Sequence, residues 1–245
     1  FLKLTIIGPW GGYPKVNEAS AGYILEHDDF NLLIDCGSGV LSKLQQYIKP
    51  TDLDACIISH YHPDHNADIG VLQHALLIDM YLTGNKKTLP IYGHDFDKES
   101  FAKLSYKDIT IGIAYDPENE LKIGPFSIRF LRTVHPVPCF SFRIEADGKV
   151  FVFTGDSAFQ EAFIDFAKDA ALLLSECNFY GNMDGSRAGH MNSRDVGKLA
   201  DQAQVQRLIL THLPHYGNLE QLVSEAGERY KGPIHLAKLG DIWKI

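Results

Sequence analysis

The 245-residue sequence predicts an α/β protein in which short strands alternate with amphipathic helices. The apolar run at 30–35 is followed by Gly37, and the apolar residues of 40–48 then recur at helical spacing until Pro50. The spacing of the apolar residues changes in the same way, from that of a strand to that of a helix, between the apolar run at 53–59 and the amphipathic segment at 66–82. No Pro-, Gly- or Ser-rich linker divides the chain, so we expect a single domain over residues 1–245.

The remaining elements are expected where apolar runs are bounded by turn residues. Strands are expected at 4–7, 22–25, 30–35, 53–59, 89–92, 126–134, 140–144, 150–153, 170–174 and 208–210. Asp147-Gly148 separates two of these runs, and this dipeptide is a strong signal for a β-hairpin. Ser193 is expected to cap one late helix and Asn218 to open another. The segment 101–120 predicts only mixed loop and strand.

Composition excludes several classes of protein. The net charge of -8 disfavours a broad basic surface for binding nucleic acid. The four cysteines have no paired spacing, and we expect them to be buried free thiols in a reducing compartment. The sequence has neither a signal-peptide pattern nor an apolar run near 18 residues, so we expect a cytoplasmic location and no membrane span.

The stretch from Ser59 to His65 concentrates metal-ligand residues. Three histidines and one aspartate fall within six positions: His60, His62, Asp64 and His65. Imidazoles and carboxylates are the ligands of zinc and similar divalent ions, and a turn places them close enough to share a site. The stretch therefore predicts part of a metal centre.

Four separate apolar runs end on a residue of this type, giving His60, His135, Asp156 and His212. Binding sites of α/β proteins form where strands end, so these residues are expected to gather at one edge of the sheets. With the opening stretch they make seven candidate ligands, whereas one catalytic zinc takes about three. Seven ligands indicate two metal ions that share a carboxylate, an arrangement suited to hydrolysis. We expect zinc, with manganese and iron as alternatives.

The stretch His60-Tyr61-His62-Pro63-Asp64-His65 resembles the HxHxDH signature of the metallo-β-lactamase superfamily, and His135, Asp156 and His212 follow in the order of that family. The resemblance implies an αββα four-layer sandwich, with two mixed sheets flanked by helices. It further implies that His60, His62 and His135 hold the first metal ion and that Asp64, His65 and His212 hold the second. Asp156 would bridge the two ions.

The sequence is most similar to the RNase Z and phosphodiesterase branch of that superfamily. Gly155-Asp156-Ser157 resembles the turn that carries the bridging aspartate, and the segments around Glu176 and His190 resemble the elements that support a general acid. The resemblance implies that Asp64 orients the attacking water or receives its proton, and that His190, steered by Glu176, assists the leaving oxygen. The hairpin between His135 and Asp156 leaves no room for the tRNA-binding arm of bacterial RNase Z, so tRNA processing is disfavoured.

We therefore expect a dinuclear metallohydrolase in which metal-bound hydroxide attacks small phosphodiesters or nucleotides. The alternatives are a thioester or lactone hydrolase of the glyoxalase type, an RNase Z-like ribonuclease, and a metal-stabilised module without catalysis. A homodimer is the default oligomeric expectation. Asp35 is expected to hydrogen-bond a ligand histidine. Trp10, Tyr13 and Tyr61 are each expected either to line the substrate pocket for a base or aryl group or to pack.

Overall fold

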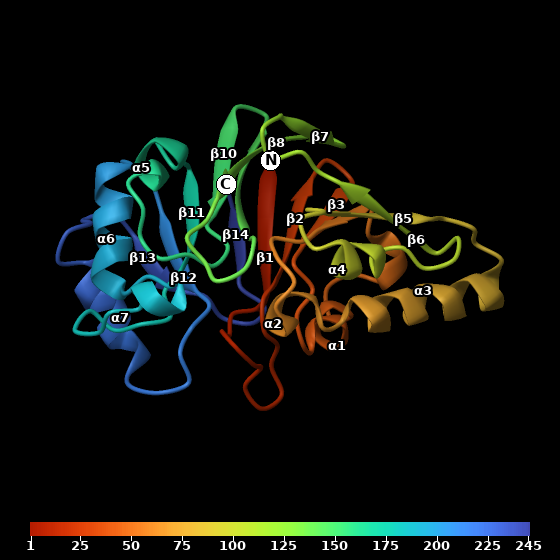
Figure 1. Cartoon of the computed structure of the whole chain (residues 1–245), viewed down its shortest axis with the longest axis horizontal. Coiled ribbons are helices and arrows are strands. Elements are labelled where there is room, and N and C mark those ends of the chain that lie inside the picture. The colour runs from red at the N-terminus through yellow and green to blue at the C-terminus, as the bar shows by residue number, and fades with distance from the viewer. The chain divides into compact units, whose positions relative to one another are not determined.

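The computed structural model of the protein describes residues 1–245 and divides into two compact units (Figure 1). The N-terminal unit comprises residues 3–116 and 239–244, and the C-terminal unit comprises residues 1–2, 117–238 and 245. Each unit is built around one seven-stranded sheet. The expectation of a single domain stays a prediction.

The sheet of the N-terminal unit has the strand order β14-β1-β2-β3-β4-β5-β6. Its strands are β1 (Leu2–Gly8), β2 (Gly22–His27), β3 (Phe30–Ile34), β4 (Ala55–Ile57), β5 (Leu89–Gly93), β6 (Thr110–Ala114) and β14 (Ile242–Lys244). β2 and β3 form an antiparallel hairpin, whereas β3, β4, β5 and β6 run parallel to one another. The parallel strands therefore end at the same edge of this sheet.

The helices of the N-terminal unit follow the predicted spacing of apolar residues. They are α1 (Val40–Leu44), the 3-10 helix η1 (Pro50–Asp52), α2 (Pro63–Asn66), α3 (Ile69–Thr83) and α4 (Lys98–Ala102). α1 buries Val40, Leu41 and Leu44 in the apolar core of the unit, and α3 adds Ile69 and Leu72 to it. The expected strand at 53–59 is shorter than predicted, because the chain leaves the sheet at Ile57 and continues as an irregular loop to α2.

The sheet of the C-terminal unit has the order β13-β12-β11-β10-β9-β8-β7. Its strands are β7 (Leu121–Ile123), β8 (Phe126–Arg132), β9 (Phe140–Ala146), β10 (Lys149–Phe153), β11 (Leu172–Glu176), β12 (Leu208–Thr211) and β13 (Ile234–Leu236). The strands from β7 to β10 are antiparallel, and those from β10 to β13 are parallel. Asp147 and Gly148 join β9 to β10 with positive φ angles of 49° and 71°, which confirms the predicted hairpin.

The helices of the C-terminal unit are α5 (Ala162–Phe166), η2 (Ser186–Ala188), α6 (Ser193–Gln202) and α7 (Leu219–Ala226). Asn218 caps α7, as predicted. The prediction that Ser193 caps α6 is wrong by one residue. The side chain of Asn192 accepts a hydrogen bond from the amide of Asp195 at 2.9 Å, and the Asp195 carboxylate binds the Asn192 amide in return. A carboxamide oxygen accepts the same hydrogen bond as a hydroxyl, so Asn192 takes the capping role that was expected of Ser193.

Two other predictions concern the whole chain. All four cysteines are buried free thiols, as expected. No helix has the length and apolar character needed to cross a membrane. A local expectation concerned the segment 101–120, for which the sequence indicated only mixed loop and strand. The segment contains all of the strand β6 and also the end of the helix α4.

Strand direction places the candidate ligands of the C-terminal unit together. β8 is antiparallel to β9, and β9 is antiparallel to β10, so β8 runs in the same direction as β10, β11 and β12. These four strands therefore end at one edge of the sheet. His135, Asp156, Glu176 and His212 lie at or just beyond these ends.

Candidate metal centre

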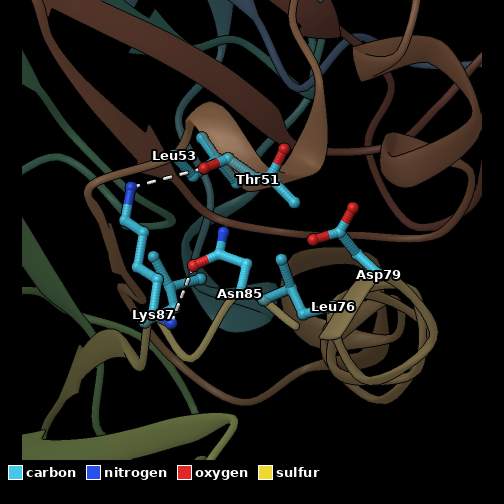
Figure 2. Close-up of a pocket in the computed structure, with 7 residues that line it drawn as sticks. Thr51, Leu53, Leu76, Asp79, Asn85 and Lys87 are labelled. Atoms are coloured by element: carbon cyan, nitrogen blue, oxygen red, sulfur yellow. Dashed lines mark hydrogen bonds between the residues drawn. The ribbon is translucent and has the colours of Figure 1, made fainter. Parts of the chain in front are cut away.

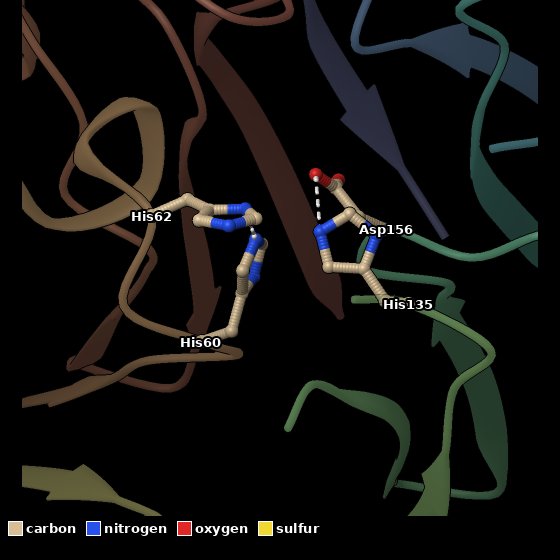
Figure 3. A group of neighbouring side chains, drawn as sticks. All are labelled: His60, His62, His135 and Asp156. Atoms are coloured by element: carbon tan, nitrogen blue, oxygen red, sulfur yellow. Dashed lines mark hydrogen bonds and ion pairs between the residues drawn. The ribbon is translucent and has the colours of Figure 1, made fainter. Parts of the chain in front are cut away.

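The N-terminal unit brings together the four metal-type residues that follow β4. Nε2 of His60 lies 3.2 Å from Nδ1 of His62, the contact drawn as a dashed line in Figure 3. The rings of His60 and His65 are 4.1 Å apart between centroids, and Nε2 of His65 lies 3.5 Å from Oδ2 of Asp64. Pro63 occupies the first turn of α2, where its fixed φ suits the start of a helix. This short helix places Asp64 and His65 beside the preceding histidines.

Asp35 orients His65 directly and His60 through Ser59. Its carboxylate is fully buried and accepts hydrogen bonds from the Ser59 amide at 2.7 Å, the Ser59 hydroxyl at 2.8 Å and Nδ1 of His65 at 2.7 Å. Oγ of Ser59 also lies 3.0 Å from Nδ1 of His60. Because Nδ1 of each histidine is engaged, Nε2 is the atom that each can offer to a metal ion. The expected hydrogen bond between Asp35 and a candidate ligand histidine is present.

Burial raises the pKa of Asp35, and the adjacent His65 and Ser59 act in the opposite direction by stabilising the carboxylate. Its backbone φ is 57°, in the left-handed region that a non-glycine residue rarely adopts. This strained residue follows β3 directly and turns its carboxylate toward Ser59 at the end of β4.

A contact that sequence reasoning missed holds Asp64. The backbone amide of Gly12, in the loop after β1, donates a hydrogen bond of 2.8 Å to Oδ2 of Asp64. Gly12 has a φ of 78°, which a glycine adopts without strain. The glycine-rich composition of this loop was visible in the sequence, but its partner was not.

The C-terminal unit brings together His135, Asp156 and His212. Oδ2 of Asp156 lies 3.2 Å from Nε2 of His212 and 3.9 Å from Nε2 of His135, and Figure 3 draws the second of these ion pairs. All three side chains are at least 95 % buried. His212 has a φ of 52°, and the side-chain amide of Asn178 donates to its carbonyl at 3.0 Å. One carboxylate oxygen thus faces two imidazole nitrogens, as a ligand shared by metal ions would.

The loop that contains Gly189 orients His135. Nδ1 of His135 donates to the carbonyl of Gly189 at 3.0 Å, which leaves Nε2 on the side of Asp156. Gly189 has a φ of 77°, and a Cβ atom at this position would lie 2.7 Å from Nδ1 of His135. Only glycine fits here without strain, because both the backbone conformation and the space exclude a side chain.

The buried Glu176 pairs with the partly buried His190 in the same unit. Nδ1 of His190 donates to Oε1 of Glu176 at 2.7 Å, and Glu176 also accepts hydrogen bonds from the amides of Ser157, Asn178 and Met191. The imidazole of His190 stacks on that of His212 with centroids 5.2 Å apart and planes inclined by 22°. The ligand atoms of Glu176, His190 and His212 lie within 4.8 Å of one another. The expected association of Glu176 with His190 is therefore present.

The donor atoms of each unit suit a divalent metal ion. They are imidazole nitrogens and carboxylate oxygens, the set that zinc, manganese and iron accept. The histidines whose Nδ1 atoms bind a carboxylate, a hydroxyl or a carbonyl are held in the orientation typical of metal ligands. His94, although buried at the end of β5, has its Nδ1 bound to the amide of Phe96 and belongs to neither set.

Two hollows of the N-terminal unit contain none of these residues. Figure 2 shows a pocket between η1, α3 and the start of β5, in which Lys87 donates to the carbonyl of Thr51 at 3.3 Å. Its volume of about 10 Å³ is near the minimum for one water molecule, too small for a substrate. A groove of about 700 Å³ runs between α3 and α4, and the proposed ligands do not line it.

Comparison with known proteins defines the class of the chain. A family model described as "Beta-lactamase superfamily domain" matches residues 30–213, more than half of the chain. The chain therefore belongs to the beta-lactamase superfamily, and its assignment as a metal-dependent hydrolase is confirmed at this level.

Individual relatives support this membership. The chain is 51 % identical over 243 residues to "Probable metallo-hydrolase YhfI" of Bacillus subtilis. The match covers 99 % of the chain and 100 % of that protein. It is 26 % identical to "Ribonuclease Z" of Methanopyrus kandleri over 93 % of the chain and 92 % of that protein.

Solved structures confirm the fold. The crystal structure of YhfI from Bacillus subtilis, described as a metallo-beta-lactamase fold protein, matches with a TM-score of 0.98, 50 % identity and 99 % and 98 % coverage of this chain and that one. A "New Diphosphatase from the PhnP Family" shares the fold with a TM-score of 0.79 at 15 % identity, covering 100 % of this chain and 98 % of that one. The predicted metallo-β-lactamase fold, with two mixed sheets flanked by helices, is thus confirmed.

Proposed function

We propose that the protein is a phosphodiesterase that acts on small phosphodiesters or nucleotides with two divalent metal ions. In this proposal the first ion is held by His60, His62 and His135, the second by Asp64, His65 and His212, and Asp156 bridges them. The proposal is supported by the membership of the superfamily and by the cluster of candidate ligand residues that lies within each unit. Two such ions, when bound, activate a water molecule and polarise the phosphoryl group.

Asp64 is placed to handle the proton of the attacking water. Its Oδ2 accepts from the rigidly turned Gly12 amide at 2.8 Å, so the carboxylate is held in one orientation. A carboxylate fixed in this way orients a water molecule through one hydrogen bond and receives its proton as the bond to phosphorus forms.

The observation that carries the choice of a phosphodiester is the pair formed by Glu176 and His190. Nδ1 of His190 binds Glu176, so we assign the contact with the leaving group to Nε2, the other ring nitrogen. An alkoxide leaves a phosphodiester readily only when it receives a proton, and an imidazolium steadied by a buried carboxylate supplies it. Thiolate leaving groups need no such proton, so a thioesterase has no use for this pair.

The comparisons support the same class of substrate. One relative is named a ribonuclease and one structural neighbour a diphosphatase, and both names refer to hydrolysis at phosphorus. The net charge of -8 favours a small substrate over a polynucleotide, because binding the latter depends on neutralising many phosphates.

The test is hydrolysis of bis(p-nitrophenyl) phosphate by protein stripped of metal and reloaded with zinc, manganese or iron. We expect turnover only after reloading, with two metal ions per chain by elemental analysis. A glutathione thioester and a lactone are assayed in parallel. Full metal content with turnover confined to the thioester or the lactone would contradict the proposal.

His190→Ala separates the leaving-group role from metal binding. The variant is expected to retain its metal content and to lose about 10²- to 10⁴-fold in kcat on a diester with an alkyl leaving group. The loss is smaller with p-nitrophenolate, which leaves without a proton. His74→Ala, which changes an exposed histidine of α3, is the matched control and keeps full activity. An equal loss on both diesters would show that His190 does not protonate the leaving group.

A further inference from the structure

The hydroxyl of Ser157 connects two loops of the C-terminal unit that carry proposed metal ligands. It accepts a hydrogen bond from the backbone amide of Val134 at 3.0 Å and donates one to the carbonyl of Ala158 at 2.6 Å. Ser157 directly follows Asp156 in the sequence, and Val134 directly precedes His135. The Ser157 side chain is fully buried, so its hydrogen bonds are shielded from solvent.

The strand order explains why a side chain makes this connection. β8 and β10 are not neighbours in the sheet, because β9 lies between them. β9 begins only at Phe140, so the segments that follow β8 and β10 meet each other beyond its start. There the amide of Ala158 donates to the carbonyl of Val134 at 2.9 Å. The Ser157 hydroxyl supplies the acceptor that the Val134 amide needs.

These two hydrogen bonds fix the backbone that leads into His135. The carbonyl of Val134 lies in the peptide plane that contains the amide nitrogen and Cα of His135, and the amide of Val134 lies in the plane before it. Holding both planes fixes the φ and ψ angles of Val134. The side chain of Val134 is 48 % exposed and anchors the segment little, so the position of His135 depends on these backbone contacts.

The separation between His135 and Asp156 makes this position critical. Nε2 of His135 lies 3.9 Å from Oδ2 of Asp156. Imidazole and carboxylate ligands lie about 2.0–2.2 Å from zinc, so two of them share one ion only when they are less than ~4.3 Å apart. A shift of His135 by about 0.5 Å away from Asp156 would therefore prevent them from sharing an ion.

We propose that Ser157 is a positioning residue whose hydroxyl holds His135 at the distance from Asp156 that a shared metal ion requires. The inference rests on the proposed function, in which His135 binds the first ion and Asp156 bridges the two. The backbone amide of Ser157 separately donates to Glu176 at 3.0 Å, a contact that any residue except proline keeps. Replacing the side chain therefore tests the hydroxyl alone.

The first test measures zinc affinity by competition with a chromophoric chelator, without substrate. Ser157→Ala is expected to weaken the binding of one of the two zinc ions about 10- to 100-fold, the loss typical when a group that orients a ligand is removed. The other ion should bind as before. Ser175→Ala is the matched control, because Ser175 is a buried serine of the same unit whose hydroxyl donates to the carbonyl of the adjacent Glu176. It should bind both ions as the wild type does.

A second pair of variants separates the hydroxyl from the bulk of the side chain. Ser157→Thr and Ser157→Val introduce side chains of nearly the same shape, so both meet the same packing cost, but only threonine keeps an acceptor for the Val134 amide. The threonine variant should bind the affected zinc ion about 10- to 100-fold more tightly than the valine variant. Equal affinities in the two variants would overturn the role of Ser157.

A double-mutant cycle shows whether Ser157 acts through His135. In the His135→Ala background, Ser157→Ala should cause no further loss of zinc affinity, whereas a general weakening of the fold would cause the same loss in both backgrounds. The same loss in both would contradict the proposal. None of these measurements involves turnover. A wild-type protein that bound two zinc ions and hydrolysed no phosphodiester would refute the proposed function without affecting the test of Ser157, so the two failures are distinguishable.

Discussion

The Nδ1 atom of His190 lies 2.7 Å from Oε1 of Glu176, and the same oxygen accepts a hydrogen bond from the amide of Ser157. Ser157 directly follows Asp156, the proposed bridging ligand. One buried carboxylate therefore fixes both the imidazole proposed to assist the leaving group and the turn that carries a metal ligand. This arrangement makes the two parts of the site depend on the charge of Glu176.

Glu176→Gln should separate the charge of this side chain from its shape. The amide keeps the size of the carboxylate but no longer stabilises a protonated His190, so kcat on a diester with an alkyl leaving group should fall at least about 10²-fold. The new NH₂ group also faces backbone amide donors, which should lower the free energy of unfolding by about 1–3 kcal/mol. Steady-state kinetics and urea unfolding measure the two effects. Unchanged kcat would contradict the role of the pair.

Asp35→Asn should weaken metal binding. Asparagine cannot accept the three hydrogen bonds from Ser59 and His65 with the same charge, so His65 loses its fixed orientation. Loss of such a supporting carboxylate typically lowers metal affinity about 10- to 100-fold. Competition with a chromophoric chelator measures the affinity. Asp29→Asn, in the exposed turn between β2 and β3, is the control and should bind metal as the wild type does.

Gly189→Ala should reduce both stability and metal content. The left-handed backbone costs alanine about 1–2 kcal/mol, and the added methyl group would also meet His135 and Pro136 at 2.7 Å. Gly148→Ala has the same kind of φ but no atom within 4 Å of the new Cβ. It should therefore lose stability while keeping its metal content. Urea unfolding and elemental analysis of the two variants test this, and equal metal content in both would refute the role assigned to Gly189.

Asn192→Ala should destabilise the protein more than Ser193→Ala does. Asn192 caps α6, and removing such a cap costs about 1 kcal/mol, which lowers Tm by roughly 2–4 °C in a chain of this size. The hydroxyl of Ser193 is buried without a hydrogen-bond partner, so replacing it by alanine should leave Tm unchanged or raise it. Thermal unfolding of both variants decides between the two caps, and the reverse order would favour Ser193.

The thiols should resist modification in the native protein. Burial raises the pKa of Cys36, Cys56 and Cys177 well above that of a free cysteine, and Cys139 is buried as well. Because the thiolate is the reactive form, a raised pKa leaves almost none of it at pH 8. Titration with a disulfide reagent should therefore detect no rapid reaction before denaturation and four thiols afterwards. Rapid reaction of any thiol in the native protein would contradict this.

The types and order of the candidate ligands could be predicted from the sequence because they are local. His60, His62, Asp64 and His65 fall within six positions, and the apolar runs that precede His135, Asp156 and His212 are recognisable strands. The class of fold followed from the same alternation of strands and helices. The number and identity of the metal ions, the cytoplasmic location and the homodimer stay predictions.

The contacts that hold these ligands could not be predicted, because they join residues far apart in the chain. The Gly12 amide reaches Asp64 across 52 positions, and the Gly189 carbonyl reaches His135 across 54. Backbone groups of this kind carry no side-chain signature. The choice of Asn192 over Ser193 as a cap is local, but it depends on a backbone conformation that both residues permit.

The sequence by itself determined which residues can bind metal ions and in which order they follow the strands. Both follow from residue type and from the spacing of apolar residues, which depend on the sequence alone. Only the tertiary structure decided that Nδ1 is the nitrogen of His65 and His135 that Asp35 and the Gly189 carbonyl bind. It also decided that Tyr13 is exposed while Trp10 is buried. Orientation and burial depend on neighbours that the folded chain brings together, and no local pattern records them.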